Sequence, residues 1–347
     1  MAGPLSIVDL ELIHSHTRDL WHEVRGQRIF ITGGTGFFGC WLVESFLHIN
    51  RVEKLDAHIT VLTRDPEAFA RKCPHLASDP ALTLHTGDIR SFSFPEGDFR
   101  YVIHAATEAG TAQAAERPLE MLETVLHGTE RTLQFAAAHG ARKFLLTSSG
   151  AVYGEQPAAI PALSEDYIGS PDPLAASSVY GESKRAAEML CALHGRAHGF
   201  ECKIARCFAF VGPHLPLDAH FAIGNFIRDA MRGEVIRVRG DGTPRRSYMY
   251  AADLAIWLWT MLFRAPSMEA FNVGSSHAVG IREAAHTVAA TLNSKIVVQV
   301  AQEPALGAHP RQYVPSAGKA ERQLGLRCTV SLEEAIRRTA LWHGFRI

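Results

Sequence analysis

Two short segments carry side chains that could act together on a carbonyl group. The first, residues 148–154, contains the hydroxyl of Ser149, and the second contains Tyr180 and Lys184 about 30 residues later. Because Tyr180 and Lys184 are four positions apart, a helix would place the phenol and the ammonium on one face. An ammonium favours the phenolate and should lower the tyrosine pKa from about 10 toward neutral pH. The sequence therefore predicts hydride-transfer chemistry in which Tyr180 acts as the acid or base.

A glycine-rich turn stands where a dinucleotide site requires one. Residues 28–32 predict a buried strand, and an apolar helix follows the turn. Gly33 permits a tight turn, Gly36 lets the backbone approach a pyrophosphate, and Gly39 allows close packing of the helix. The N–H groups at the start of such a helix bind phosphate oxygens. The residues expected to contact the cofactor here are Gly33, Gly36, Phe37, Phe38 and Gly39.

The end of the second predicted strand, residues 58–63, bears on the choice of cofactor. An acidic residue there binds the ribose 2′-hydroxyl of NAD, whereas an arginine can bind the 2′-phosphate of NADP. Arg64 comes first, and Asp65 followed by Pro66 could simply form a turn. The sequence therefore favours NADP slightly over NAD.

Strand-like and helix-like segments alternate through the first half of the chain. Further strands are expected at 82–85, 101–104, 143–147 and 203–208. Such alternation predicts an α/β fold with a Rossmann-type, doubly wound parallel sheet. After residue 208 the pattern becomes irregular, which indicates a smaller C-terminal α/β part.

Composition excludes several other classes of protein. The 347 residues carry a net charge of -1, which gives no electrostatic reason to expect nucleic acid or an anionic membrane as partner. The six cysteines include no Cys-x-x-Cys pair, and His194 with His198 lacks a zincin pattern, so no metal site is expected. The absence of a secretory signal and of a long apolar run favours the cytoplasm.

Several motifs occur in the order and spacing of one known family. They are the glycine turn, Gly87-Asp88-Ile89, His104-Ala105-Ala106, Ser148-Ser149, Val152-Tyr153-Gly154, Tyr180-x-x-x-Lys184 and Gly240-Asp241-Gly242. On these residues the chain resembles the extended short-chain dehydrogenase/reductases, specifically the NAD(P)-dependent nucleotide-sugar epimerase/dehydratase group, over about residues 26–345. The resemblance implies a cytoplasmic oxidoreductase or isomerase of carbohydrate biosynthesis that binds a nucleotide sugar and forms a homodimer.

The resemblance also implies roles for individual residues. Ser149 would bind the reacting sugar oxygen, Tyr180 would transfer its proton, and Lys184 would hold the ribose of the cofactor. Further cofactor contacts are implied for Asp88, Ile89, Ala105, Ala106 and Thr107. Substrate contacts are implied for Ser149, Asn225, Arg246 and Arg311, the arginines because their fork geometry suits diphosphate oxygens.

These motifs suggest three parts of the chain. Residues 1–25 would form an N-terminal helical extension, with a helix over 9–24. Residues 26–208 would form the dinucleotide-binding domain, to which 244–264 returns. Residues 209–243 and 265–347 would form the nucleotide-sugar-binding domain.

One departure from the family restricts the chemistry. In the 4,6-dehydratases of the group, an Asp-Glu pair that eliminates water follows the catalytic Ser or Thr, and the decarboxylases keep a glutamate there. Gly150 and Ala151 occupy these positions, and neither side chain can move a proton. The residues therefore argue against a nucleotide-sugar 4,6-dehydratase.

Three functions remain open. A 4-epimerase would oxidise C4 of the sugar and return the hydride to the opposite face without net redox change. A 4-ketoreductase would consume NADPH once per turnover, which Arg64 favours slightly. A non-catalytic nucleotide-binding relative is disfavoured because Ser149, Tyr180 and Lys184 are all present.

Overall fold

A seven-stranded parallel sheet organises the structure, a computed structural model that describes residues 2–106, 116–219, 221–293, 295–305, 307 and 309–346. The strand order is β11-β6-β5-β4-β1-β2-β3. The strands are β1 (Arg28–Thr32), β2 (His58–Thr63), β3 (Leu82–Thr86), β4 (Tyr101–His104), β5 (Lys143–Ser149), β6 (Glu201–Cys207) and β11 (Glu269–Val273). The order reverses between β1 and β4, which is where doubly wound sheets bind ligands. The predicted Rossmann-type fold is confirmed.

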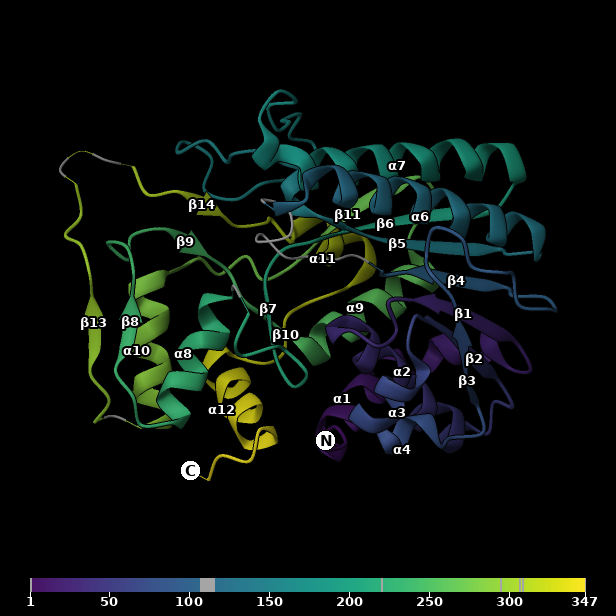
Figure 1. Ribbon diagram of the computed structural model, residues 1–347, viewed down its shortest axis with the longest axis horizontal. Helices are drawn as coiled ribbons and strands as arrows, with labels where there is room; N and C mark the ends of the chain where they lie inside the picture. The colour runs from purple at the N-terminus through teal and green to yellow at the C-terminus, as the bar shows by residue number, and fades with distance from the viewer. Residues whose placement is uncertain are drawn as a thin grey trace.

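Helices cover both faces of this sheet (Figure 1). On one face, α6 (Pro118–Ala138) packs against α7 (Val179–His198), which contacts β5 and β6. On the other face, α2 (Phe37–Glu53) packs against α9 (Ala251–Arg264), which also contacts β5 and β6. The short helices α3 (Pro66–Lys72) and α4 (Pro74–Ala77) follow β2. Because helices bury both faces, consecutive residues such as Ile29, Phe30 and Ile31 are all buried.

The N-terminal segment packs onto the rest of the chain. The single helix expected over 9–24 is divided into α1 (Ile7–Thr17) and a 3-10 helix, η1 (Arg18–Val24). The buried carboxylate of Asp9 accepts a hydrogen bond from Tyr250 Oη at 2.8 Å and one from Arg338 Nη1 at 2.6 Å. These contacts tie α1 to the C-terminal helix α12 (Leu332–Trp342).

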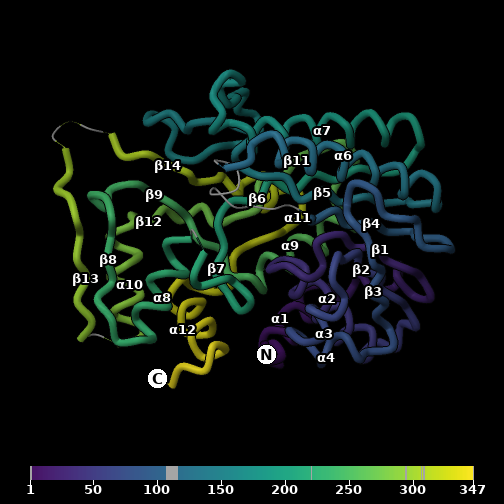
Figure 2. The backbone as a smooth tube through the Cα atoms, in the orientation of Figure 1, coloured from purple at the N-terminus to yellow at the C-terminus, as the bar shows by residue number. Residues whose placement is uncertain are grey.

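A smaller α/β part follows β6 and lies beside the open end of the sheet, at the left of Figures 1 and 2. Its helices are α8 (Ala222–Met231), α10 (Ile281–Leu292) and α12, whereas α11 (Gly318–Leu324) packs against β11 and α9 of the larger part. Its strand pairs and triplet are β7 (Phe210–Val211) with β10 (Met249–Tyr250), β8 (Ile236–Val238) with β13 (Val298–Val300), and β9 (Arg245–Arg246) between β12 (Val279–Gly280) and β14 (Gln312–Tyr313).

The expected boundary at residue 264 misplaces one strand. We expected 265–347 to lie in the smaller part, but β11 pairs in parallel with β6 and completes the main sheet. Only the last three of its five residues are buried, so this edge strand lacks the continuous apolar run of a central strand.

A buried polar cluster supports the carboxyl end of β4. The two ring nitrogens of His104 lie 2.7 Å from Thr32 Oγ1 and 3.1 Å from Thr129 Oγ1. Burial lowers the pKa of His104 to about 3, so the imidazole is neutral inside the fold. This cluster joins β1, β4 and α6 directly beneath the glycine turn.

Within the described residues, no helix combines the length and the apolar character needed to cross a membrane.

Candidate active site

A cavity of about 1410 Å³ runs along the carboxyl ends of the main strands to the smaller part. The predicted site residues that line it are Gly33, Gly36, Phe37, Phe38, Arg64, Asp88, Ile89, Ala105, Ala106, Ser149, Tyr180, Lys184, Arg246 and Arg311. Gly39 and Asn225 are not among the described residues of the lining, and Thr107 lies outside the described residues. The fold therefore brings most of the predicted site into one cavity.

The glycine turn has the shape that a pyrophosphate site needs. Gly33 adopts a φ of +71°, and a Cβ added there would lie 2.5 Å from the carbonyl carbon of Ala105. A Cβ on Gly39 would lie 2.3 Å from Gly33 O, so Gly39 serves helix packing, as its position predicts. Gly36 caps α2 without a side-chain hydrogen bond, which leaves the helix N-terminus to other acceptors. These residues fit a dinucleotide.

Ser149, Tyr180 and Lys184 meet in the middle of this cavity. Ser149 ends β5, where its Oγ accepts a hydrogen bond from Ala151 N at 3.1 Å, and it lies close enough to Tyr180 to lower the pKa of that phenol. Lys184 lies one helical turn beyond Tyr180 on α7, and its Nζ donates to Thr147 O at 2.8 Å. The hydroxyl, the phenol and the ammonium are thus held by β5 and α7, which pack directly against each other.

Burial dominates the ionisation of these groups. Burial raises the pKa of Tyr180 to about 12, and the hydrogen bond with Ser149 offsets only part of the increase. Burial also lowers the pKa of Lys184 to about 8. In the chain without cofactor, burial therefore decides the Tyr180 pKa, and the lowering expected from Lys184 and an oxidised nicotinamide stays a prediction for the cofactor-bound site.

Two aromatic residues that we did not predict as part of the reacting centre enclose Ser149. Tyr313 Oη lies 3.4 Å from Ser149 Oγ, and the rings of Tyr313 and Phe208 lie 4.7 Å apart. A Cβ added to Gly150 would lie 2.6 Å from the Phe208 ring and 2.8 Å from Tyr313 Oη. The aromatic pair therefore occupies the space that a side chain at position 150 would need.

Tyr313 is fixed by backbone pairing. Strand β14 pairs in parallel with β9, which places Tyr313 beside Arg246. The next residue is held on both sides, since Val314 N donates to Gln156 Oε1 at 2.9 Å and Val314 O accepts from Leu163 N at 2.8 Å. In the sequence, the absence of a side chain at Gly150 is the signal that could have indicated the close approach of Phe208 and Tyr313.

The predicted substrate residues differ in how they are placed. The Arg246 guanidinium is partly buried and lies 5.7 Å from the Tyr313 ring centroid. The Arg311 side chain is exposed, with its Nε 3.8 Å from a Glu155 carboxylate oxygen. Asn225 instead donates from Nδ2 to Leu217 O at 2.7 Å and to Ala219 O at 2.8 Å, so the amide holds the loop before α8.

Arginines line the cavity at the ends of β2 and β3. Asp65 is used as the N-cap of α3, where its Oδ1 accepts from Ala68 N at 2.8 Å. Asp88 Oδ1 accepts from Arg90 Nε at 2.8 Å, and this hydrogen bond lowers the pKa of the Asp88 carboxyl. Arg64 and Arg90 both line this end of the cavity.

Comparison with known proteins agrees with this architecture. The chain is 31% identical to UDP-glucuronic acid decarboxylase 6 of Arabidopsis thaliana over 310 residues, which are 89% of this chain and 87% of the relative. Among solved structures, a UDP-galactose 4-epimerase is 26% identical with a TM-score of 0.72, covering 92% of this chain and 99% of that one. The dTDP-glucose 4,6-dehydratase DesIV of Streptomyces venezuelae is 23% identical with a TM-score of 0.75, covering 92% and 97%.

The model of the NAD dependent epimerase/dehydratase family matches residues 29–274. This range holds the glycine turn, the Ser149 segment and the Tyr180 helix, which together carry most of the cavity described above. The chain therefore belongs to the NAD dependent epimerase/dehydratase family.

Proposed function

We propose that this protein catalyses hydride transfer at C4 of a nucleotide-activated sugar, as a 4-ketoreductase or a 4-epimerase, with Tyr180 as the acid or base. The observation that carries the proposal is the surroundings of Ser149. A hydroxyl, a phenol and an ammonium meet there, while Phe208 and Tyr313 fill the space next to Gly150. The site can thus move a hydride and a proton, whereas neither Gly150 nor Ala151, the two residues after Ser149, carries an acid for elimination.

Each residue of the proposed centre has a physical role. Ser149 Oγ would hydrogen-bond the sugar oxygen at C4, and Tyr180 would donate its proton to that oxygen in the reductive direction. A pKa of about 12 keeps the Tyr180 phenol protonated at neutral pH, as a proton donor requires. A bound nicotinamide would supply or accept the hydride and, when oxidised, would add a positive charge that favours the phenolate.

The cofactor preference follows the charges at the far end of the cavity. Arg64 and Arg90 line that end, and Asp65 is occupied as a helix cap. Arginine side chains suit a 2′-phosphate, which supports NADP and hence the ketoreductase. The 4-epimerase remains the second candidate because the matched family is described as NAD dependent and the chain is 26% identical to a UDP-galactose 4-epimerase.

The substrate would lie between the two parts of the chain. Arg246 and Arg311 line the cavity beyond Ser149, on or next to β9 and β14, where they could bind a diphosphate. In this proposal residues 209–250 with most of 265–347 bind the nucleotide sugar, and 26–208 with α9 bind the dinucleotide; the expected return to the first domain at 244 thus begins later, because β9 and β10 pair within the smaller part.

The test is a panel of nucleotide sugars assayed with NADH and NADPH. Oxidation of one NADPH for each 4-keto sugar consumed supports the ketoreductase. Interconversion of C4 epimers without net change in cofactor supports the epimerase. Release of a 4-keto-6-deoxy product, or of carbon dioxide from a nucleotide-linked uronic acid, would refute the proposal. A protein that binds cofactor but turns over none of these sugars would favour a non-catalytic relative.

A further inference from the structure

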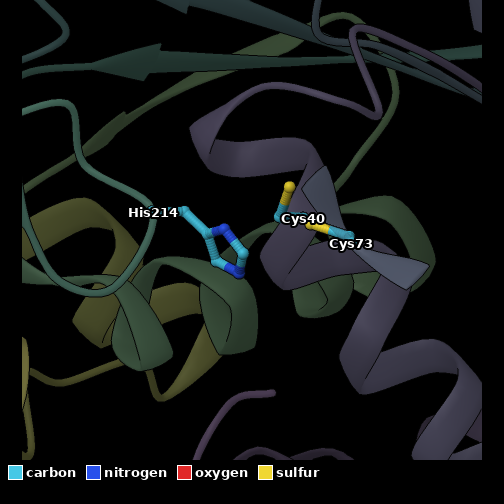
Figure 3. Close-up of side chains that lie close together, drawn as sticks. All are labelled: Cys40, Cys73 and His214. Carbon is cyan, nitrogen blue, oxygen red and sulfur yellow. The ribbon is translucent and has the colours of Figure 1, made fainter. Parts of the chain in front are cut away.

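Three potential metal ligands meet beneath the glycine turn, although their sequence spacing predicts no site. Cys40 lies in the first turn of α2, Cys73 directly follows α3, and His214 lies in the turn after β7. One ligand atom of each lies within 4.8 Å of the other two. Figure 3 shows the His214 ring extending from its loop toward the two cysteine side chains.

All three side chains are shielded from solvent. Cys40 and Cys73 are fully buried, and His214 is 6% exposed. Both ring nitrogens of His214 lack a hydrogen-bond partner among the described residues. A neutral imidazole carries one N–H and one lone pair, and burying either unpaired costs about 1–3 kcal/mol. His214 also holds a φ of +70°, a conformation that non-glycine residues rarely adopt.

We propose that Cys40, Cys73 and His214 bind one zinc ion. Two thiolates and a neutral imidazole are a ligand set that Zn²⁺ prefers, and they neutralise its charge in a buried site. Metal binding also gives a partner to one of the two imidazole nitrogens. Contact with Cys73 and burial raise the pKa of the Cys40 thiol, and the Lys72 ammonium, 4.0 Å from Cys40 Sγ, offsets part of this increase.

The geometry requires only a small contraction. At a Zn–S bond of about 2.3 Å, tetrahedral ligand atoms lie about 3.8 Å apart. The three ligand atoms are at most 4.8 Å apart. Side-chain rotations that move these atoms by about 1 Å would therefore bring them to the separation that zinc coordination requires.

A fourth ligand can be water. No other Cys, His, Asp or Glu atom joins this group among the described residues. A cavity of about 450 Å³ borders the group at His214 and Lys72, and in this proposal the water ligand would come from it. Three protein ligands with an open fourth position is a coordination that zinc proteins use.

Bound zinc would link three segments that contribute residues to the active-site cavity: the start of α2, the end of α3 and the loop after β7. Cys40 follows the glycine turn, its Sγ lies 3.6 Å from Thr35 O, and Thr35 lines that cavity. His214 precedes Leu215 and Pro216, which line the same cavity. Bound metal should therefore stabilise the packing of the glycine turn on the loop that contains His214.

The experiment titrates the full-length protein, reduced and freed of metal with a chelator, with Co²⁺ as a spectroscopic substitute for zinc. We expect one equivalent to bind, with a thiolate-to-cobalt charge-transfer band and the visible bands of tetrahedral cobalt. Zn²⁺ should displace the cobalt and raise the melting temperature of the protein. A wild-type protein that shows no thiolate band, or whose melting temperature Zn²⁺ leaves unchanged, overturns the proposal.

Variants identify the ligands. Cys73→Ser keeps the side-chain shape, and His214→Asn keeps a residue that tolerates positive φ. Each should weaken Co²⁺ binding by more than about 10-fold, the lower end of what even an outer-shell partner contributes. Cys328→Ser, at an exposed cysteine outside the cluster, should bind like the wild type. A thiolate band that survives both cluster variants, or that Cys328→Ser removes, refutes the assignment. Circular dichroism of each variant verifies that it is folded.

Discussion

Tyr180 holds its proton tightly because its phenol is buried beside Ser149, and this makes it a donor rather than a phenolate at rest. We predict that Tyr180→Phe lowers kcat for hydride transfer by about 10²–10⁴-fold, the usual contribution of a positioned acid or base. The dissociation constant of the cofactor should stay close to the wild-type value.

Stopped-flow absorbance of NADPH measures the rate, and fluorescence titration measures cofactor binding. Tyr101→Phe is the matched control, because Tyr101 is also a buried phenol but donates to Glu23 O away from the cavity. Wild-type turnover in Tyr180→Phe would contradict the role of Tyr180.

Lys184 should set the alkaline limit of the reaction. Burial lowers its pKa to about 8, so its ammonium loses a proton as the pH rises through that value. We predict that kcat/KM for ketone reduction falls above a pH of about 8, whereas Tyr180 stays protonated to about 12. Lys184→Arg keeps a permanent charge, so its profile should lack this alkaline limb even if its rate is lower. If kcat/KM of the Lys184→Arg variant falls above a pH of about 8 as in the wild type, a group other than Lys184 causes the fall.

The reacting residues that the sequence predicts are the ones that lie in local motifs. Ser149 ends a strand, and Tyr180 and Lys184 share one face of a helix. Short-range geometry is therefore enough to identify these three residues as candidates for the reaction. Tyr313 lies 164 residues from Ser149 and reaches it only through the β9–β14 pairing, which no local pattern encodes. Asn225 shows the opposite error, because its amide satisfies loop carbonyls instead of facing the cavity.

The contact of η2 (Gly150–Tyr153) with Phe208 and β14 can be tested by packing. We predict that Gly150→Ala lowers the free energy of unfolding by about 1–3 kcal/mol, because its Cβ would overlap Phe208 and Tyr313. Tyr313→Phe removes one of the overlapping atoms. The double variant should therefore be more stable than the sum of the single changes predicts.

Urea unfolding of the four proteins measures this coupling. Gly3→Ala is the control, since a Cβ there would meet nothing within 4 Å. Strictly additive changes, or a Gly150→Ala variant as stable as Gly3→Ala, would mean that the aromatic pair does not fill this space.

The cluster that joins β1, β4 and α6 should make the fold sensitive to acid. The pKa of His104 is about 3 in the folded chain and 6.5 when unperturbed. As the pH falls below 6.5, His104 becomes protonated in the unfolded chain but stays neutral in the folded chain. The free energy of unfolding therefore falls. Between pH 7 and pH 5 this loss is about 2 kcal/mol.

His104→Gln removes the titrating group, so it should reduce the pH 7 to pH 5 loss by about that amount, measured by urea unfolding at both pH values. His277→Gln, at an exposed histidine, should leave the loss unchanged. An identical pH dependence in His104→Gln and the wild type would contradict this prediction.

The central strands are predictable from sequence because each is a buried apolar run followed by a polar turn. Strands β1 and β2 match the expected limits, and helices separate them in the expected order. β11 is not predictable in this way, since it is a half-exposed edge strand whose place depends on how α9 crosses the sheet. The apolar spacing of residues 9–24 likewise does not reveal that α1 ends at Thr17 and continues as the 3-10 helix η1.

The two ends of the chain stabilise the molecule jointly. Asp9 of α1 is buried, and both its oxygens are occupied, by Tyr250 and by Arg338 of α12. We predict that Asp9→Ala lowers the free energy of unfolding by about 1–3 kcal/mol, because it leaves the buried Tyr250 hydroxyl without an acceptor, whereas Arg338 keeps its ion pair with Glu334.

Asp19→Ala is the control, since its ion pair with Arg264 joins two exposed side chains and should contribute less than about 1 kcal/mol. Both values come from denaturant unfolding monitored by tryptophan fluorescence. Equal effects of the two substitutions would contradict a joint role of the chain ends.

The aromatic pair beside Gly150 also limits how this molecule could change its chemistry over evolutionary time. An acid at position 150 needs room that the Phe208 ring and the Tyr313 hydroxyl now occupy, and these residues lie in distant parts of the chain. Any path that takes the steps singly passes through a crowded, less stable protein. Introducing the first acid of a dehydratase at position 150 should therefore succeed better when Phe208 or Tyr313 is made smaller in the same variant.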